Sequence, residues 1–328
     1  MRYVYGPVPS RRLGQSLGID TIPLKTCNWN CVYCQLGRTV PLVNERREYV
    51  PHEQALAEVE TALAEHAPGE IDWVTFVGSG ETCLHSGLGW MIRGVKRLTE
   101  LPVAVITNGS LLYQPEVRDD LAPADAVLPS LDAGEAGLYR KLNRPHPQAS
   151  FERLVQGLMD FRAAYAGKLW VEVMLLQGMN DDEQSLHRIG EVLGRIRPDA
   201  VHVLLPTRPP AEPWVRPTDE EGIERAMAIL GQVAEIVHPA QGEFDLGDSA
   251  DVVDAILGVI TRHPMGQDEL ERALAGCKGT DVQRTLQLLA ESGRAKVIER
   301  HGERFWSPAA ARFVDGERSG RSHCSSCS

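Results

Sequence analysis

Short apolar runs alternate with amphipathic stretches from about residue 18 to residue 237. Six runs have the length and composition of strands buried in a parallel sheet: 18–22, 73–77, 103–107, 126–130, 169–176 and 200–205. The stretches between them repeat apolar residues at helical spacing, for example over 186–196 and 223–237. The pattern predicts an α/β fold, a partial TIM-type (β/α)6 barrel, with the active site at the carboxyl ends of its strands.

A second pattern begins near residue 249. It predicts helices over 250–262, 267–274 and 280–292 and a hairpin over 295–307. This order favours a small C-terminal winged-helix-like domain, and a helical cap that packs on the barrel is the alternative. A fold of this kind does not by itself imply DNA binding. We expect three parts: a barrel over 1–243, the winged-helix-like domain over 244–308, and a flexible Cys-containing tail over 309–328.

The composition is that of an ordinary globular protein. No apolar run reaches the roughly 20 residues that cross a bilayer, and Pro and Gly interrupt the N-terminus where a signal peptide is apolar. We therefore expect a cytoplasmic protein that does not enter a membrane. The net charge of -11 disfavours nucleic acid as a partner, although local patches can still bind anions. One basic group precedes the first long helix, and it suits either a solvated surface or anion binding: Arg2, Arg11, Arg12, Lys25, Arg38, Arg46 and Arg47.

The sharpest chemical signal is a cysteine-rich loop directly after the first predicted strand. Cys27, Cys31 and Cys34 have the spacing C-x3-C-x2-C. An iron-sulfur cluster bound by three thiolates leaves one iron open to an outside ligand. A structural zinc site is normally closed by four ligands, and this loop contains no fourth Cys or His. The loop therefore predicts a 4Fe-4S cluster rather than zinc.

The cysteine loop resembles that of the radical SAM superfamily. Further segments over about residues 5–210 resemble the Fe-S oxidoreductases related to tRNA wyosine base synthases: GPVPSRRLGQSLGID, VTFVGSGET, TNGSLL, PSLDA, NRPH and LLPTRPP. The resemblance implies an enzyme that uses the cluster to cleave S-adenosylmethionine (SAM) reductively to a 5'-deoxyadenosyl radical. It leaves the substrate open among a peptide, a protein, a small metabolite and tRNA.

The loops after the other strands supply candidate SAM contacts. Gly80 and Glu81 occupy a turn where the superfamily typically has Gly-Gly-Glu-Pro, although Ser79 and Thr82 depart from that pattern. The resemblance also assigns Asn108, Ser130 and Asp132 to SAM, with helix capping as the alternative. It places Tyr33 beside the adenine, and packing within the cysteine loop is the alternative for this residue.

Polar residues farther along are candidate substrate contacts by location alone: Asn143, Arg144, His146, Glu172, Asn180 and Arg208. Cys83 is expected to be a packed thiol.

The tail contains a C-x2-C pair, Cys324 and Cys327. This pair suits a second cluster, completed by Cys277 or His323, a redox-active dithiol, or no function at all. The sequence shows no flavin or nicotinamide fingerprint, so a ferredoxin or flavodoxin is the expected electron donor. Two rival classes remain: an iron-sulfur redox sensor that binds DNA through the winged-helix domain, and an interaction module with structural zinc.

Overall fold

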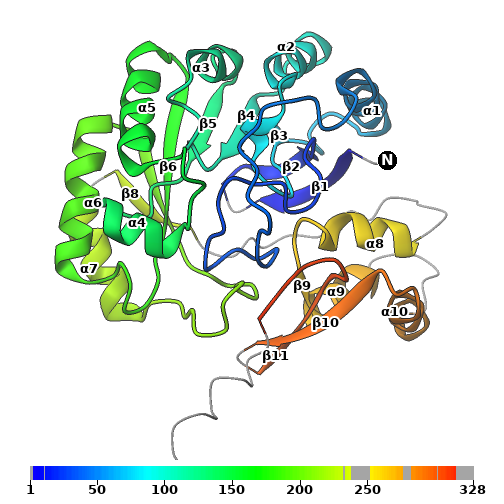
Figure 1. Cartoon of the computed structure of the whole chain (residues 1–328). Coiled ribbons are helices and arrows are strands. Elements are labelled where there is room, and N and C mark those ends of the chain that lie inside the picture. The colour runs from blue at the N-terminus through cyan, green and yellow to red at the C-terminus, as the bar shows by residue number, and fades with distance from the viewer. Residues whose placement is uncertain are drawn as a thin grey trace, which may run out of the picture.

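An eight-stranded sheet forms the body of the molecule, in the order β1 to β8 (Figure 1). The computed structural model describes residues 3–10, 12–231, 233–237, 252–275, 282–300 and 302–314. The strands of this sheet are β1 Val4–Ser10, β2 Gly14–Ile19, β3 Trp73–Phe76, β4 Val103–Thr107, β5 Ala126–Pro129, β6 Lys168–Met174, β7 Ala200–Leu204 and β8 Ala234–Ile236.

Each of the six predicted strands overlaps one of β2 to β7, which pair in parallel. The first prediction, 18–22, overlaps β2 only at Gly18 and Ile19, because that strand runs from Gly14 to Ile19. The expectation of an α/β partial barrel is therefore confirmed. Two edge strands were not predicted. β1 contains two prolines and pairs antiparallel with β2, while β8 lies in a stretch that we expected to continue a helix. That helix ends at Leu230 because Gly231 adopts a φ of 88°, which breaks the helical path.

Alternation along the strands gives the sheet two different faces. Apolar residues on one face, such as Val74, Val105 and Val171, pack against helices in the main core. The opposite face carries Trp73 and Trp170, and its small core includes Leu13 from the turn between β1 and β2. The N-terminal hairpin thus helps to fill the inner face of the barrel.

Helices follow most strands and lie along the outer side of the sheet (Figure 1). They are α1 His52–Glu65, α2 Leu88–Leu98, α3 Pro115–Leu121, α4 Ala136–Leu142, α5 Phe151–Ala164, α6 Glu183–Ile196 and α7 Glu220–Leu230, with a 3-10 turn η1 Thr82–Leu84. Side chains that accept a backbone N–H fix three helix starts: Ser150 for α5, Asp182 for α6 and Asp219 for α7. Every helix in the described ranges is too short or too polar to cross a membrane.

The C-terminal unit has the elements that its sequence predicted, plus one short strand. These are α8 Val252–Ile260, β9 Met265–Gly266, α9 Gln267–Ala275, α10 Val282–Glu291, β10 Ala295–Arg300 and β11 Glu303–Pro308. The strands form a sheet in the order β10-β11-β9 over a core that includes Ile256, Leu270 and Trp306. The winged-helix likeness stays a prediction, and the expected boundary at 243/244 falls outside the described residues.

The first residues of the predicted tail contact the barrel. Arg38 N donates to Arg312 O at 2.6 Å, and Val314 N donates to Ala211 O at 3.4 Å. Arg312 therefore lies beside the cysteine loop, and the predicted tail beyond residue 314 falls outside the described residues. Cys277, His323, Cys324 and Cys327 fall outside the described residues.

Candidate active site

Three thiols occupy the long segment between β2 and α1. Each sulfur accepts at least one N–H: Cys27 Sγ from Trp29 N at 3.4 Å, Cys31 Sγ from Asn143 Nδ2 at 3.7 Å, and Cys34 Sγ from Lys25 Nζ at 3.1 Å. Such donors stabilise negative charge on sulfur, which is the form that binds metal.

The thiols also influence one another. Burial raises the pKa of Cys27 to about 12, with smaller contributions from Glu81 and Cys34. Burial, followed by the proximity of Cys34 and Cys27, raises the pKa of Cys31 well above its ordinary value. Three mutually close thiols in a partly buried loop fit a bound metal group, because coordination replaces the proton that burial otherwise keeps on sulfur.

The turn after β3 packs directly against the cysteine loop. Lys25 N donates to Ser79 O at 2.7 Å, and Glu81 N donates to Thr26 O at 2.9 Å. A Cβ atom on Gly80 would lie 1.9 Å from Thr26 O, so only glycine permits this approach. The structure thus brings Gly80 and Glu81 beside the cysteines, as their sequence positions predicted.

Glu81 is buried and held by groups from two strand ends. Its carboxylate accepts from Cys83 N at 2.9 Å, Thr107 Oγ1 at 2.5 Å and Asn108 N at 2.7 Å. Burial raises the pKa of this carboxyl, and the donors oppose that rise. Cys83 is a packed thiol 3.3 Å from Thr107 Oγ1, as expected.

Asn108 connects the end of β4 to the cysteine loop. Its Nδ2 donates to Asn28 Oδ1 at 2.7 Å and lies 3.9 Å from Cys27 Sγ. Asn28 is fully buried, and its Nδ2 donates to Ser110 Oγ at 2.8 Å. The sequence did not predict the roles of Lys25, which donates to the Cys34 sulfur, and of Asn28, which accepts from Asn108. Their positions within the cysteine segment were the available signal.

Asp132 organises the other side of the loop. Its Oδ2 accepts from Tyr33 Oη at 2.5 Å and from Asn143 Nδ2 at 2.6 Å, while Oδ1 accepts from Met174 N at 2.8 Å. Asn143 is fully buried and reaches the Cys31 sulfur. The structure thus places Asn143 beside Cys31, and its contact with a substrate stays a prediction. Ser130 lies at the same strand end, half-buried, in a bridge with Glu172.

Arg144, in the loop after α4, contacts the segment after β7. Its guanidinium pairs with Glu212, which also accepts from Arg38 at 2.9 and 2.8 Å. These arginines hold the pKa of Glu212 below its ordinary value despite the opposing effect of burial. His146 lies on the same side, and its backbone N donates to Asn28 O at 2.7 Å. Glu212 was not predicted, because nothing in its local sequence signals two arginine partners.

Three further predicted substrate contacts have structural partners. Asn180 is fully buried, and its amide bonds Leu176 N, Asp132 O and Met174 O at 2.8–2.9 Å. Glu172 pairs with Arg12 on the inner face of the barrel. Arg208 pairs with Glu269 of α9 at 3.3 Å. The Asn180 amide therefore supports a turn, and Arg208 contacts the C-terminal unit. The contacts of these three residues with a substrate stay predictions.

The family comparison agrees with this geometry. The pattern of the radical SAM superfamily matches residues 21–189, which include the three cysteines and the turns after β3, β4 and β5. A radical SAM methyltransferase from Sphaerobacter thermophilus superposes with a TM-score of 0.52 at 18% identity, over 67% of this chain and 66% of that one, and it supports the fold alone. The chain belongs to the radical SAM superfamily: it is an enzyme of this type, with a 4Fe-4S cluster and SAM as cofactors.

Relatives place it more narrowly, in the UPF0026 family. The UPF0026 protein of Methanocaldococcus jannaschii is 34% identical over 278 residues, 84% of this chain and 86% of that protein. The UPF0026 protein of Synechocystis sp. is 40% identical over 63% of this chain and 76% of its own length. A protein named GTPase Obg from Brachyspira hyodysenteriae is 41% identical over 89% of this chain, yet this chain spans only 43% of it. The name of that longer protein therefore does not describe this chain.

Proposed function

We propose that Cys27, Cys31 and Cys34 bind the 4Fe-4S cluster and that the chain cleaves SAM reductively. The observation that carries this proposal is the set of three mutually close thiols, each with an N–H donor to its sulfur. When bound, the cluster supplies the electron that splits SAM into methionine and a 5'-deoxyadenosyl radical, and a ferredoxin or flavodoxin renews that electron. Superfamily membership favours this turnover over a DNA-binding sensor.

The strand ends beside the cysteines supply the proposed SAM site. Gly80 lets backbone approach closely, and the Glu81 carboxylate suits the SAM ammonium, because its three protein donors occupy only part of its roughly four acceptor positions. Asn108, Ser130 and Asp132 lie at neighbouring strand ends, where they can bind the ribose and methionine parts. Tyr33, held by Asp132, is proposed to flank the adenine.

The substrate proposed for this site is not a polyanion. Three arginines of the N-terminal basic group already pair with acids: Arg12 with Glu172, Arg38 with Glu212 and Arg46 with Asp120. Paired guanidinium groups contribute little to the phosphate binding on which nucleic-acid affinity depends. A peptide or small metabolite suits this paired surface better than tRNA. The proposed substrate contacts are Asn143, Arg144, His146, Glu172, Asn180 and Arg208.

The direct test is release of 5'-deoxyadenosine by the anaerobically reconstituted chain, given SAM and dithionite. We expect release by the unaltered protein and neither release nor full iron content in Cys31→Ala. The matched variant Cys83→Ala should keep its iron, since this thiol contacts Thr107 and lies outside the trio. If Cys31→Ala still releases 5'-deoxyadenosine, the assignment is wrong.

A further inference from the structure

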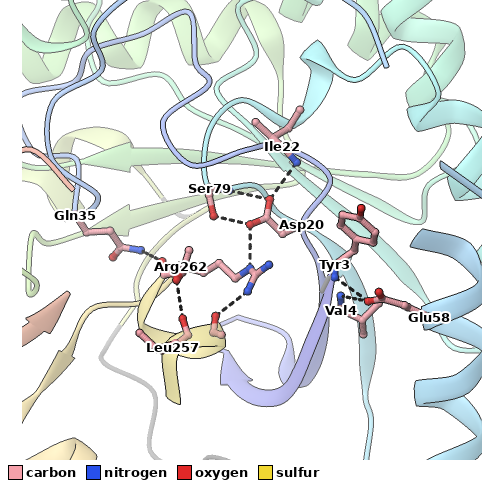
Figure 2. Close-up of polar contacts among 11 residues, drawn as sticks. Tyr3, Val4, Asp20, Ile22, Gln35, Glu58, Ser79, Leu257 and Arg262 are labelled. Atoms are coloured by element: carbon pink, nitrogen blue, oxygen red, sulfur yellow. Dashed lines mark hydrogen bonds and ion pairs between the residues drawn. The ribbon is translucent and has the colours of Figure 1, made fainter. Parts of the chain in front are cut away.

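A buried ion pair joins the C-terminal unit to the barrel beside the proposed SAM turn. Arg262, just past α8, directs its Nε to Asp20 Oδ2 at 2.9 Å, and Asp20 directly follows β2 (Figure 2). The side chains are 12% and 3% exposed, respectively. The Arg262 guanidinium also stacks over the Tyr5 ring, 4.7 Å from its centroid. An arginine this enclosed contributes a fixed contact and not a mobile surface charge.

The same carboxylate holds Ser79, the residue at which this chain departs from the superfamily's usual glycine. Asp20 Oδ1 accepts from Ser79 N at 3.0 Å, and Oδ2 accepts from Ser79 Oγ at 2.5 Å (Figure 2). Ser79 is fully buried and precedes Gly80 and Glu81. The serine hydroxyl thus gives the proposed SAM turn a contact with Asp20 that a glycine could not make.

Two further contacts join the C-terminal unit to the cysteine loop. Gln35 follows Cys34, and its Nε2 donates to Arg262 O at 2.9 Å. Gly37 forms a backbone bridge with Arg312, and a Cβ atom at Gly37 would lie 2.4 Å from Arg312 O. The unit therefore contacts the segment just beyond the third cysteine as well as Asp20, which follows β2.

We infer that Arg262 is a positioning residue for SAM binding, and that the C-terminal unit sets the SAM turn through Arg262, Asp20 and Ser79. This inference rests on the proposed function, since it assigns the turn at Gly80 and Glu81 to SAM. The contacts form a continuous chain: Arg262 holds the Asp20 carboxylate, Asp20 holds Ser79, and Ser79 O accepts from Lys25 N of the cysteine loop at 2.7 Å. Loss of the guanidinium leaves a buried carboxylate short of one partner and loosens the turn.

The test uses the reconstituted full chain. It measures the Kd for SAM and compares turnover at limiting and at saturating SAM, which separates an effect on KM from an effect on kcat. We expect Arg262→Met to retain its iron and to bind SAM about tenfold more weakly, within the range of coupling between sites. Ser79→Ala, which removes only the hydroxyl partner of Asp20, should weaken SAM binding in the same direction. The double variant should raise the Kd for SAM by a smaller factor than the product of the two single factors, because both changes act through Asp20.

Arg294→Met is the matched control, since Arg294 lies in the same unit and pairs with Asp254 at a 60% exposed position. It should change the Kd for SAM by less than about twofold. Unchanged SAM affinity in both Arg262→Met and Ser79→Ala, or strictly multiplicative effects, overturns the inference. If Arg262→Met fails to take up iron, the Kd for SAM of Ser79→Ala alone tests the inference. Failure of the unaltered protein to bind SAM instead refutes the proposed function.

Discussion

At the scale of single residues, polar side chains around the cysteines form a shell held by buried acids. Asp132 orients Tyr33 and Asn143, and Glu81 gathers donors from two strand ends. The cysteines and Glu81 could be predicted because each lies in a short local pattern. The roles of Asn143 and Asn180 could not, because their partners are identified only by the fold and their type is common in loops.

His202 supplies a pH test of the barrel interior. Burial, assisted by nearby Arg12, lowers its pKa to about 4 from an ordinary 6.5. Its Nε2 lies 2.8 Å from Glu235 Oε1, while its Nδ1 is buried and has no hydrogen-bond partner among the described residues, which fits a neutral ring. Since the unfolded chain binds this proton first, the stability that His202 contributes is present above the unfolded pKa and is lost as pH falls toward 4.

We therefore expect the free energy of unfolding to fall less steeply with decreasing pH in His202→Gln than in the unaltered chain. From about pH 7 to about pH 5, the unaltered chain should lose about 2 kcal/mol more free energy of unfolding than the variant. Urea unfolding of both proteins at the two pH values measures this difference. The contributions of the carboxyl groups cancel, because both proteins contain them. Parallel losses in the two proteins would show that His202 titrates normally in the folded state.

At the scale of elements, β2 to β7 were predictable because each strand has an apolar core of ordinary length. The edge strands were not. β1 contains prolines that weaken any strand prediction, and β8 continues an apolar spacing that also suits a helix, so tertiary pairing with β2 and β7 decided both. The C-terminal elements were predictable, yet their contacts with the cysteine loop were not, because β-bridges such as that of Gly37 with Arg312 carry no local signal.

The turn between β3 and η1 tolerates no side chain at Gly80. Gly80→Ala should lower the free energy of unfolding by about 1–3 kcal/mol, as overpacked sites do, because Thr26 O occupies the space of the new Cβ. It should also lower the iron content, since the cysteine loop must shift. Iron analysis and chemical unfolding check both effects.

Gly194→Ala is the matched control in α6, where a Cβ would meet nothing within 4 Å. This change should raise stability by about 0.5–1 kcal/mol through helix propensity, with iron unchanged. Equal behaviour of the two alanine variants would contradict the close approach of the turn to the cysteine loop.

At the scale of the whole molecule, charge pairing shapes what the enzyme can bind. The net charge is -11, and arginines beside the cysteine loop pair with Glu212 and Asp120. We expect filter-binding with bulk tRNA to show only weak association at low salt, and no complex that survives physiological salt. Tight tRNA binding with a steep salt dependence would contradict the proposal that the substrate is not a polyanion.

The proposed chemistry depends on three cysteines that leave one iron of a four-iron cluster open for SAM. Mössbauer spectroscopy of the chain reconstituted with isotopically enriched iron examines that iron directly, by recording the spectrum before and after SAM is added. We expect a four-iron cluster in which a single iron site changes its parameters on SAM addition. A spectrum that SAM leaves unchanged, or a protein that retains zinc and no iron, would contradict the assignment.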